Sequence, residues 1–121
     1  LAQMGGADGR GARRLRQAAA AILVCGDLDR AFPPAPDFWV IDAAIAAQNM
    51  TLAANDLGIG SVWLGTWPDE KRVKRQTAIF QLPETIVPHS ILALGYPAED
   101  IDMRAVRPSR YEENRVHVNQ W

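Results

Sequence analysis

The sequence predicts a layered fold of the α/β or α+β class. Three short apolar runs, at residues 21–25, 61–64 and 89–94, alternate with segments of helical periodicity. Glycine and proline clusters separate these segments, as is typical of turns and loops. The 121 residues have the length of one domain. Because three strands are fewer than most sheets contain, we expect a further strand from a partner or from another part of a longer chain.

The first quarter of the chain is expected to hold a loop, a short helix and a strand. Residues 1–11 contain four glycines and little apolar periodicity, which favours a loop. Ala12–Ala19 has the character of a short helix. Ala21–Cys25 is a compact apolar run closed by Gly26 and Asp27, which predicts a buried strand.

A long apolar helix is predicted over Phe38–Leu57. The prolines within Asp29–Pro36 predict an extended loop before it, and Asp37 is suited to cap its first turn. Nearly every turn of the helix is apolar on more than one side, so most of its surface should be buried. A chain of this length has few elements to surround such a helix. We therefore expect a homodimer in which a second copy packs on Phe38–Leu57.

The next segment is expected to form a strand that ends in a turn. Gly58 and Gly60 are typical of a helix stop, and Ser61–Leu64 then predicts a short strand. Residues 65–68, Gly-Thr-Trp-Pro, predict a turn. A turn at the end of a buried strand can offer free backbone N–H groups to a ligand, which makes this turn a candidate binding site.

One further helix and one further strand are predicted after this turn. Pro68 is suited to the first position of a helix that ends near Phe80. Pro83 and Pro88 are expected to bracket a loop, after which His89–Leu94 predicts a buried strand.

The composition excludes several classes of partner. The net charge is −1, with 48% hydrophobic and 22% charged residues, so we expect neither nucleic acid nor a membrane surface as a partner. No apolar run approaches the roughly 20 residues of a membrane-spanning helix. The single cysteine, Cys25, fits a reducing compartment, and the cytoplasm is the expected location. The two histidines have no third group to complete a metal-binding set, so no metal is expected.

Four segments, in this order along the chain, resemble the flavin-dependent nitroreductase family. Residues 42–54 contain DAA, AQN and LAA, a pattern similar to the central helix of that family. GIGSVWLG at 58–65 resembles the family's GLGxxWxG strand and turn. LPETIVP and LGYP, within 82–97, resemble LPE…VP…LGYP, and the arginine-rich tail at 107–121 resembles the family's ending. ILVCGD at 22–27 fits the preceding strand.

The resemblance implies an α+β domain with a central antiparallel or mixed sheet, and an FMN-dependent enzyme. Such an enzyme transfers electrons from NAD(P)H to nitroaromatic, quinone or similar acceptors by a ping-pong mechanism. The flavin carries the chemistry, so no catalytic side chain is expected. No GxGxxG dinucleotide fingerprint occurs in the chain, and the residues do not distinguish NADH from NADPH.

The resemblance also implies where FMN binds. Trp63, Leu64 and Gly65 would pack on the flavin ring, with the Gly65 N–H directed at its N5/O4 edge. Glycine permits such a close approach of the backbone. Arg107 and Arg110 would hold the ribityl phosphate, and Arg110 aligns better with the family. The alternatives are that Gly65 is only a turn residue and that both arginines belong to a solvated tail.

One departure from the family pattern lies in residues 1–19. The family's Arg-Ser-x-Arg signature, which grips FMN, has no match there, because Arg13-Arg14-Leu15-Arg16 lacks the serine. The chain therefore resembles the C-terminal part of a nitroreductase and forms a single partial domain over 1–121. One alternative function is a non-catalytic dimeric remnant that binds flavin weakly or not at all. Another is a flavin-fragmenting or dehalogenating relative.

The remaining titratable candidates are expected to have structural roles. His89 opens a buried strand and is expected to be a structural residue or a polar cap. His117 is expected to be a packing residue in the tail. Cys25 ends an apolar run and is expected to be a buried, inert thiol.

Polar residues of the long helix are interpreted as hydrogen-bonding contacts across the dimer interface rather than as catalytic residues. These residues are Asp42, Gln48 and Asn49. Several aromatic residues either line a substrate pocket at the dimer interface or pack in the core: Phe32, Phe38 and Trp39. Trp67 is expected to pack at the entry of the following helix.

Overall fold

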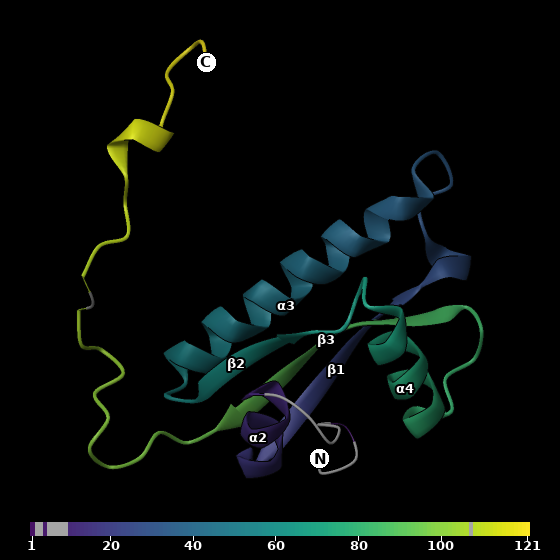
Figure 1. Ribbon diagram of the computed structural model, residues 1–121, viewed down its shortest axis with the longest axis horizontal. Coiled ribbons are helices and arrows are strands. Elements are labelled where there is room, and N and C mark those ends of the chain that lie inside the picture. Colours follow the sequence, from purple (N-terminus) through teal and green to yellow (C-terminus); the bar gives the residue numbers. More distant parts are fainter. Residues whose placement is uncertain (2–3, 5–9, 107) are drawn as a thin grey trace.

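The protein is a three-stranded antiparallel sheet with helices on both faces (Figure 1). The computed structural model describes residues 1, 4, 10–106 and 108–121. The strands are β1 (Ala20–Asp27), β2 (Gly60–Gly65) and β3 (Ile86–Gly95), in the order β1-β3-β2. The α-helices are α2 (Arg10–Gln17), α3 (Trp39–Asp56) and α4 (Glu70–Phe80), and the 3₁₀ helices are η1 (Leu28–Arg30), η2 (Pro36–Phe38) and η3 (Glu113–Arg115). The α+β prediction is confirmed.

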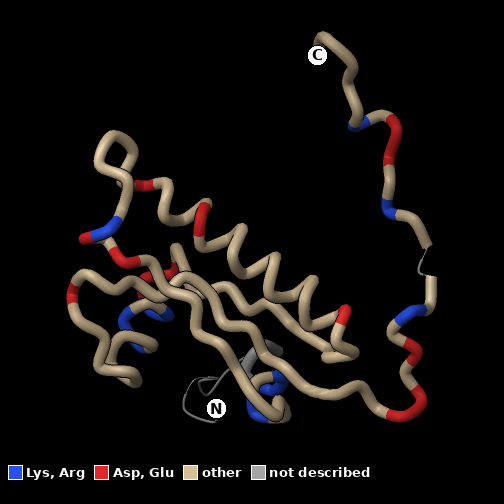
Figure 2. Tube along the Cα trace, turned by 180° about the vertical axis from the view of Figure 1, so that it is seen from behind, with Lys and Arg blue, Asp and Glu red and all other residues tan. Residues whose placement is uncertain are grey.

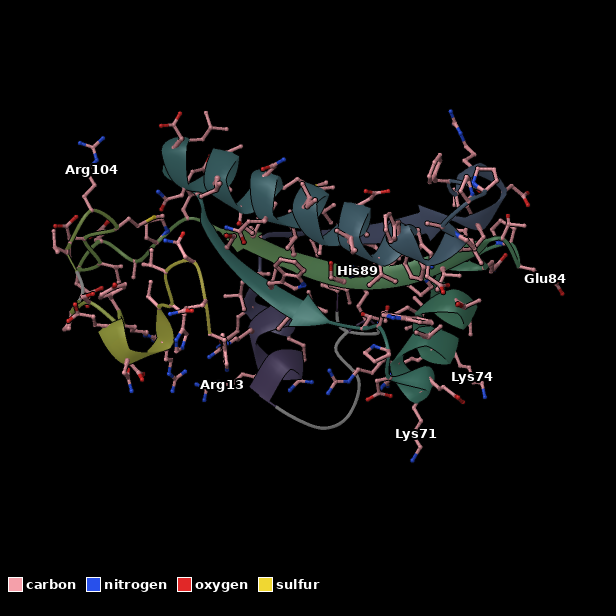
Figure 3. All side chains as sticks on the ribbon, turned by 90° about the horizontal axis from the view of Figure 1, so that it is seen from above. Arg13, Lys71, Lys74, Glu84, His89 and Arg104 are labelled. Carbon is pink, nitrogen blue, oxygen red and sulfur yellow. The ribbon has the colours of Figure 1, made fainter. Side chains whose placement is uncertain are left out.

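Two apolar clusters hold the helices to the sheet. On one face, α3 packs on β1 and β3 through the buried residues Val24, Trp39, Ala43, Ala47 and Leu92. On the other face, Leu15 of α2 packs on β3 together with partly buried residues of β1 and β2. Figure 3 shows the resulting layers, with α3 on one side of the sheet and α2 and α4 on the other. The central strand is β3, so both clusters depend on it.

The strand β3 begins three residues earlier than predicted and contains a bulge. Pro88 was expected in a loop, but it lies inside the strand and is fully buried. The register pairs Val24 of β1 with Ser90 and Cys25 with Pro88, so His89 is the extra residue. Proline has no N–H to donate and is tolerated in strands at such irregular positions. The bulge therefore explains how β3 continues through Pro88.

The helix α3 matches the predicted Phe38–Leu57 helix to within one residue at each end. The prediction that Asp37 caps it is wrong, because Asp37 lies in η2 and the cap residue Phe38 makes no side-chain hydrogen bond. The loop prediction for 29–36 is also wrong in part, because η1 and η2 form at its two ends. Pro36 lies at the start of η2, where its missing N–H costs no hydrogen bond.

The helix α4 begins two residues later than predicted. Pro68 does not take its first position. It follows a cis peptide bond after Trp67 and belongs to the turn. Asp69 is the cap residue, and its side chain accepts hydrogen bonds from the N–H groups of Lys71 and Arg72. A capping carboxylate satisfies the free N–H groups of a first turn, which explains the later start.

The segment after β3 leaves the sheet and runs away from it (Figure 1). Figure 2 shows that both acidic and basic residues occur along this tail, whereas the basic residues of the folded body lie mainly on α2 and α4. The helix α3 carries no Lys or Arg. None of the described helices is long and apolar enough to cross a membrane.

Candidate functional site

Three tryptophans and a histidine gather where β2 ends. The Trp39 ring meets the Trp67 ring edge to face, with 5.2 Å between centroids, and the His89 ring lies 6.0 Å from Trp39 and 6.1 Å from Trp63. They come from α3, from the turn after β2, from β3 and from β2. The cluster lies on the α3 face of the sheet and includes Trp63 of the predicted flavin site. Trp63 remains 37% exposed, so its surface is accessible.

His89 is buried at the centre of this cluster (Figure 3). Its Nδ1 lies 3.1 Å from the Ser90 hydroxyl. Burial lowers the pKa of His89, because an imidazolium would lose hydration there. The neutral ring and the aromatic contacts agree with the structural role predicted for this residue.

Gly65 presents open backbone at the end of β2. A Cβ atom placed on Gly65 would have no described heavy atom within 4 Å outside its chain neighbours. At Gly26 of β1, by contrast, a Cβ atom would lie 2.3 Å from the Trp39 ring. Packing within the chain therefore requires glycine at 26 but not at 65. Gly65 is also among the exposed residues, so a ligand can approach its backbone.

The turn that follows Gly65 is fixed by hydrogen bonds from two sides. The His89 carbonyl at the bulge accepts the N–H groups of Thr66, at 3.0 Å, and Trp67, at 2.9 Å. The Gly65 carbonyl accepts a hydrogen bond from Nη1 of Arg72, at 2.9 Å. Sequence reasoning did not identify Arg72. No pattern in the sequence indicates this contact, because it joins a helix to a strand.

The other predicted site residues are distributed over the molecule. The side chain of Leu64 packs in the α2-side cluster, on the face opposite Trp63. Arg107 lies outside the described residues. Arg110 is exposed on the tail, which leaves the sheet at the end opposite Gly65, because Gly60 pairs with Gly95 and Gly65 with Ser90. The structure thus brings Trp63 and Gly65 to one site and leaves Arg110 apart from them.

The remaining candidates have mostly structural surroundings. Cys25 is half-buried, and burial raises the pKa of its thiol, as expected of an unreactive cysteine. His117 stacks on Trp121 with 4.2 Å between ring centroids. Trp39 is a core residue, and it also lines a cavity of about 610 Å³ together with Phe32 at the end of β1. Among the described residues no group of three potential metal ligands occurs.

Polar residues of α3 lie on its exposed side. They are Asp42, Gln48 and Asn49. Large apolar residues accompany them there, including Ile45, which is 56% exposed, and Leu52, which is 60% exposed. The helix therefore covers the sheet with one face only and leaves a second apolar face open.

Comparison with known proteins identifies relatives along most of the chain. The model of the Nitroreductase family matches residues 6–96. A protein of Methanothermobacter thermautotrophicus, provisionally named NADH dehydrogenase/NAD(P)H nitroreductase, is 40% identical over 107 residues. That match covers 88% of this chain and 53% of the relative, so the chain spans about half the length of this relative.

Solved structures resemble the whole fold. A protein of Bacteroides thetaiotaomicron with the same provisional name matches with a TM-score of 0.82 and 37% identity, over 98% of this chain and 65% of its own. An FMN-dependent nitroreductase of Clostridium difficile R20291 matches with a TM-score of 0.78 and 27% identity, over 98% of this chain and 67% of its own.

Proposed function

Because this chain belongs to the nitroreductase family, we propose that it is part of an FMN-dependent oxidoreductase. Its electron donor would be NAD(P)H, and its acceptor a small molecule such as a nitroaromatic or a quinone. The relatives named as NAD(P)H nitroreductase and FMN-dependent nitroreductase support the donor and the cofactor. In a ping-pong mechanism donor and acceptor would use one pocket in turn.

The observation that carries this proposal is the open backbone at Gly65. Glycine is unusual at an exposed strand end where a side chain would have space, unless something outside the chain needs that space. The residue lies beside the exposed Trp63, whose ring offers a flat apolar surface. An N–H donor next to an apolar surface suits a planar heteroaromatic ring such as the isoalloxazine of FMN. The residues present therefore fit the ring of this cofactor.

FMN, when bound, supplies the transfer of hydride and electrons between donor and acceptor. The task of the chain is to bind and orient it. In this proposal the Gly65 N–H donates to the ring edge, and Trp63 covers apolar ring surface. Leu64 contributes its backbone, since its side chain packs on the other face. A donor fixed at the ring edge favours the negative charge that accompanies reduction.

Arg107 and Arg110 are proposed to bind the ribityl phosphate, because arginine makes paired hydrogen bonds to phosphate oxygens. Arg110 follows the last residue of β3, Gly95, by fifteen positions. An extended segment of that length spans about 50 Å, enough to bring Arg110 back to the Gly65 end of the sheet of its own chain or of a second copy.

We further propose that α3 mediates a homodimer. Its outward face exposes Ile41, Ile45 and Leu52, which form an apolar stripe with the i, i+4 and i+11 spacing of one helix side. Light scattering after size-exclusion chromatography should give a dimer for the chain and a monomer for Ile45→Glu. A monomeric wild type would contradict this part of the proposal.

Titration with FMN tests the cofactor assignment. The chain should quench FMN fluorescence with saturation, and Gly65→Val should weaken binding by about tenfold or more, because a branched side chain enters the space that the ring needs. The variant should unfold at the temperature of the wild type, since no described atom contacts the new side chain. A wild type that does not bind FMN would refute the cofactor assignment and favour the non-catalytic dimeric remnant.

A further inference from the structure

We propose that Arg72 is a positioning residue that fixes the backbone of Gly65 for contact with the flavin. The inference rests on the proposed function, because it concerns the same turn. Arg72 belongs to α4, on the side of the sheet opposite the aromatic cluster, and its guanidinium bonds the last carbonyl of β2.

The peptide unit between Gly65 and Thr66 is held at both ends. Its carbonyl oxygen accepts from Arg72 Nη1 at 2.9 Å, and its N–H donates to the His89 carbonyl at 3.0 Å. A peptide unit is planar, so two hydrogen bonds on opposite edges fix the orientation of the whole unit. On the preceding side, Leu64 is fixed by packing in the α2-side cluster. The Gly65 N–H therefore lies between two anchored points.

Gly65 needs such anchors more than another residue would. Glycine has no Cβ atom and has the widest backbone freedom of any residue. No described heavy atom outside its chain neighbours lies within 4 Å of its Cβ position, so side-chain packing does not restrict it either. Without Arg72, the carbonyl of Gly65 would lose its charged partner and the peptide would keep only the hydrogen bond to His89. The N–H that faces the ligand would then sample a wider range of directions.

Arg72 is itself held in place by Asp69. The Arg72 Nε lies 3.2 Å from Asp69 Oδ2, while Asp69 Oδ1 caps α4 by accepting the N–H groups of Lys71, at 3.0 Å, and Arg72, at 3.2 Å. One guanidinium thus bonds the carboxylate through Nε and the Gly65 carbonyl through Nη1. Lysine has a single nitrogen on a flexible stem and cannot reproduce both contacts with fixed geometry.

The charge of Arg72 gives this residue a second effect on the flavin. The guanidinium compensates the Asp69 carboxylate beside the turn, so loss of Arg72 would leave a negative charge there that disfavours reduced FMN relative to the uncharged oxidised ring. The side chains of Arg72 and Asp69 are 62% and 47% exposed, so solvent screens the ion pair and its own contribution to stability is small. Loss of Arg72 should therefore change flavin affinity and potential much more than it changes folding.

Two arms of one experiment test the proposal, with Arg72→Gln, Arg72→Lys and the control Arg75→Gln. Arg75→Gln removes the same charge from the same exposed helix without touching the turn. In the first arm, the flavin-free chain is labelled with ¹⁵N. The heteronuclear NOE of the Gly65 amide should fall in Arg72→Gln, fall partly in Arg72→Lys, and stay at the wild-type value in Arg75→Gln.

The second arm measures binding of oxidised and of dithionite-reduced FMN. In Arg72→Gln, oxidised FMN should bind about three times more weakly and reduced FMN about 30 times more weakly, while Arg75→Gln binds both as the wild type does. That tenfold difference corresponds to a midpoint potential about 30 mV lower for the two-electron couple.

The outcomes separate this proposal from the function on which it rests. An unchanged Gly65 NOE in Arg72→Gln would refute the positioning role. Equal weakening in Arg72→Gln and Arg75→Gln would refute it too, because a general charge effect would then be enough. If wild type binds no FMN, the proposed function fails, and the NMR arm alone decides whether Arg72 fixes the turn.

Discussion

Adding one methyl group at Gly26 of β1 should disrupt the packing of Trp39 in the aromatic cluster. A Cβ atom at this position would lie 2.3 Å from Trp39 Cε3, 2.8 Å from Cδ2 and 3.0 Å from Cζ3. Ordinary contacts begin near 3.4 Å, so the indole or the strand must move by about 1 Å. The indole contacts Trp67 and His89 edge to face, so a shift of the ring would disturb both contacts. We expect Gly26→Ala to lower the free energy of unfolding by about 1–3 kcal/mol.

Thermal unfolding followed by circular dichroism measures this effect. For a domain of this size each kcal/mol lowers the melting temperature by roughly 3–6 °C. Gly65→Ala is the matched control, because its methyl group meets open space and should leave the melting temperature within a few degrees of the wild type. The Trp39→Phe variant lacks the Cε3 and Cζ3 atoms. Gly26→Ala should therefore lower the free energy of unfolding less in the Trp39→Phe background than in the wild type. Additive effects of the two substitutions, or a Gly26→Ala chain as stable as the wild type, would refute the reasoning.

Three further predictions concern titratable and capping groups. Burial lowers the pKa of His89, so the unfolded chain binds more protons than the folded one below pH about 6.5. Urea unfolding should show that the free energy of unfolding falls as the pH is lowered through this range. In His89→Gln this pH dependence should be weaker, because the titrating group is gone. Burial raises the pKa of the Cys25 thiol, so iodoacetamide at neutral pH should alkylate it more slowly in the folded chain than in urea, and equal rates would contradict the burial argument. Asp69→Ala should lower the free energy of unfolding by about 1 kcal/mol, because α4 loses its cap. Glu70→Ala should lower it less, and melting temperatures of the two variants measure the difference.

Most of the fold could be predicted because its elements follow local patterns. The periodicity of α3, the apolar runs of the strands and the glycines after α3 are local signals, and each of these elements lies within three residues of its expected bounds. The errors arose where a tertiary contact decides the outcome. The sequence predicts that Pro88 closes a loop, but the bulge at His89 accommodates this proline within β3 although it cannot join a regular ladder.

The site could be predicted only where a motif marks it. Trp63 and Gly65 are predicted because the GIGSVWLG segment resembles a family pattern. The structure places both near the end of β2, and their contact with flavin stays a prediction. The contact between Arg72 and Gly65 joins a helix to a strand, and no periodicity within either element indicates it. The bulge shows in the structure as the odd spacing of Val87 and Leu92. Strict alternation would put them on opposite faces of β3, yet both pack on α3.

The bulge at His89 also determines which changes in chain length β3 can accept. It reverses the alternation of the strand, so Val87 faces α3 only because one extra residue intervenes. Deleting one residue here would straighten the ladder and turn Val87 towards α4. Relatives of this chain can therefore vary the side chain at this position more freely than the number of residues around it. A relative with a one-residue deletion within 87–92 would lack the bulge that presents the His89 carbonyl to the turn after Gly65.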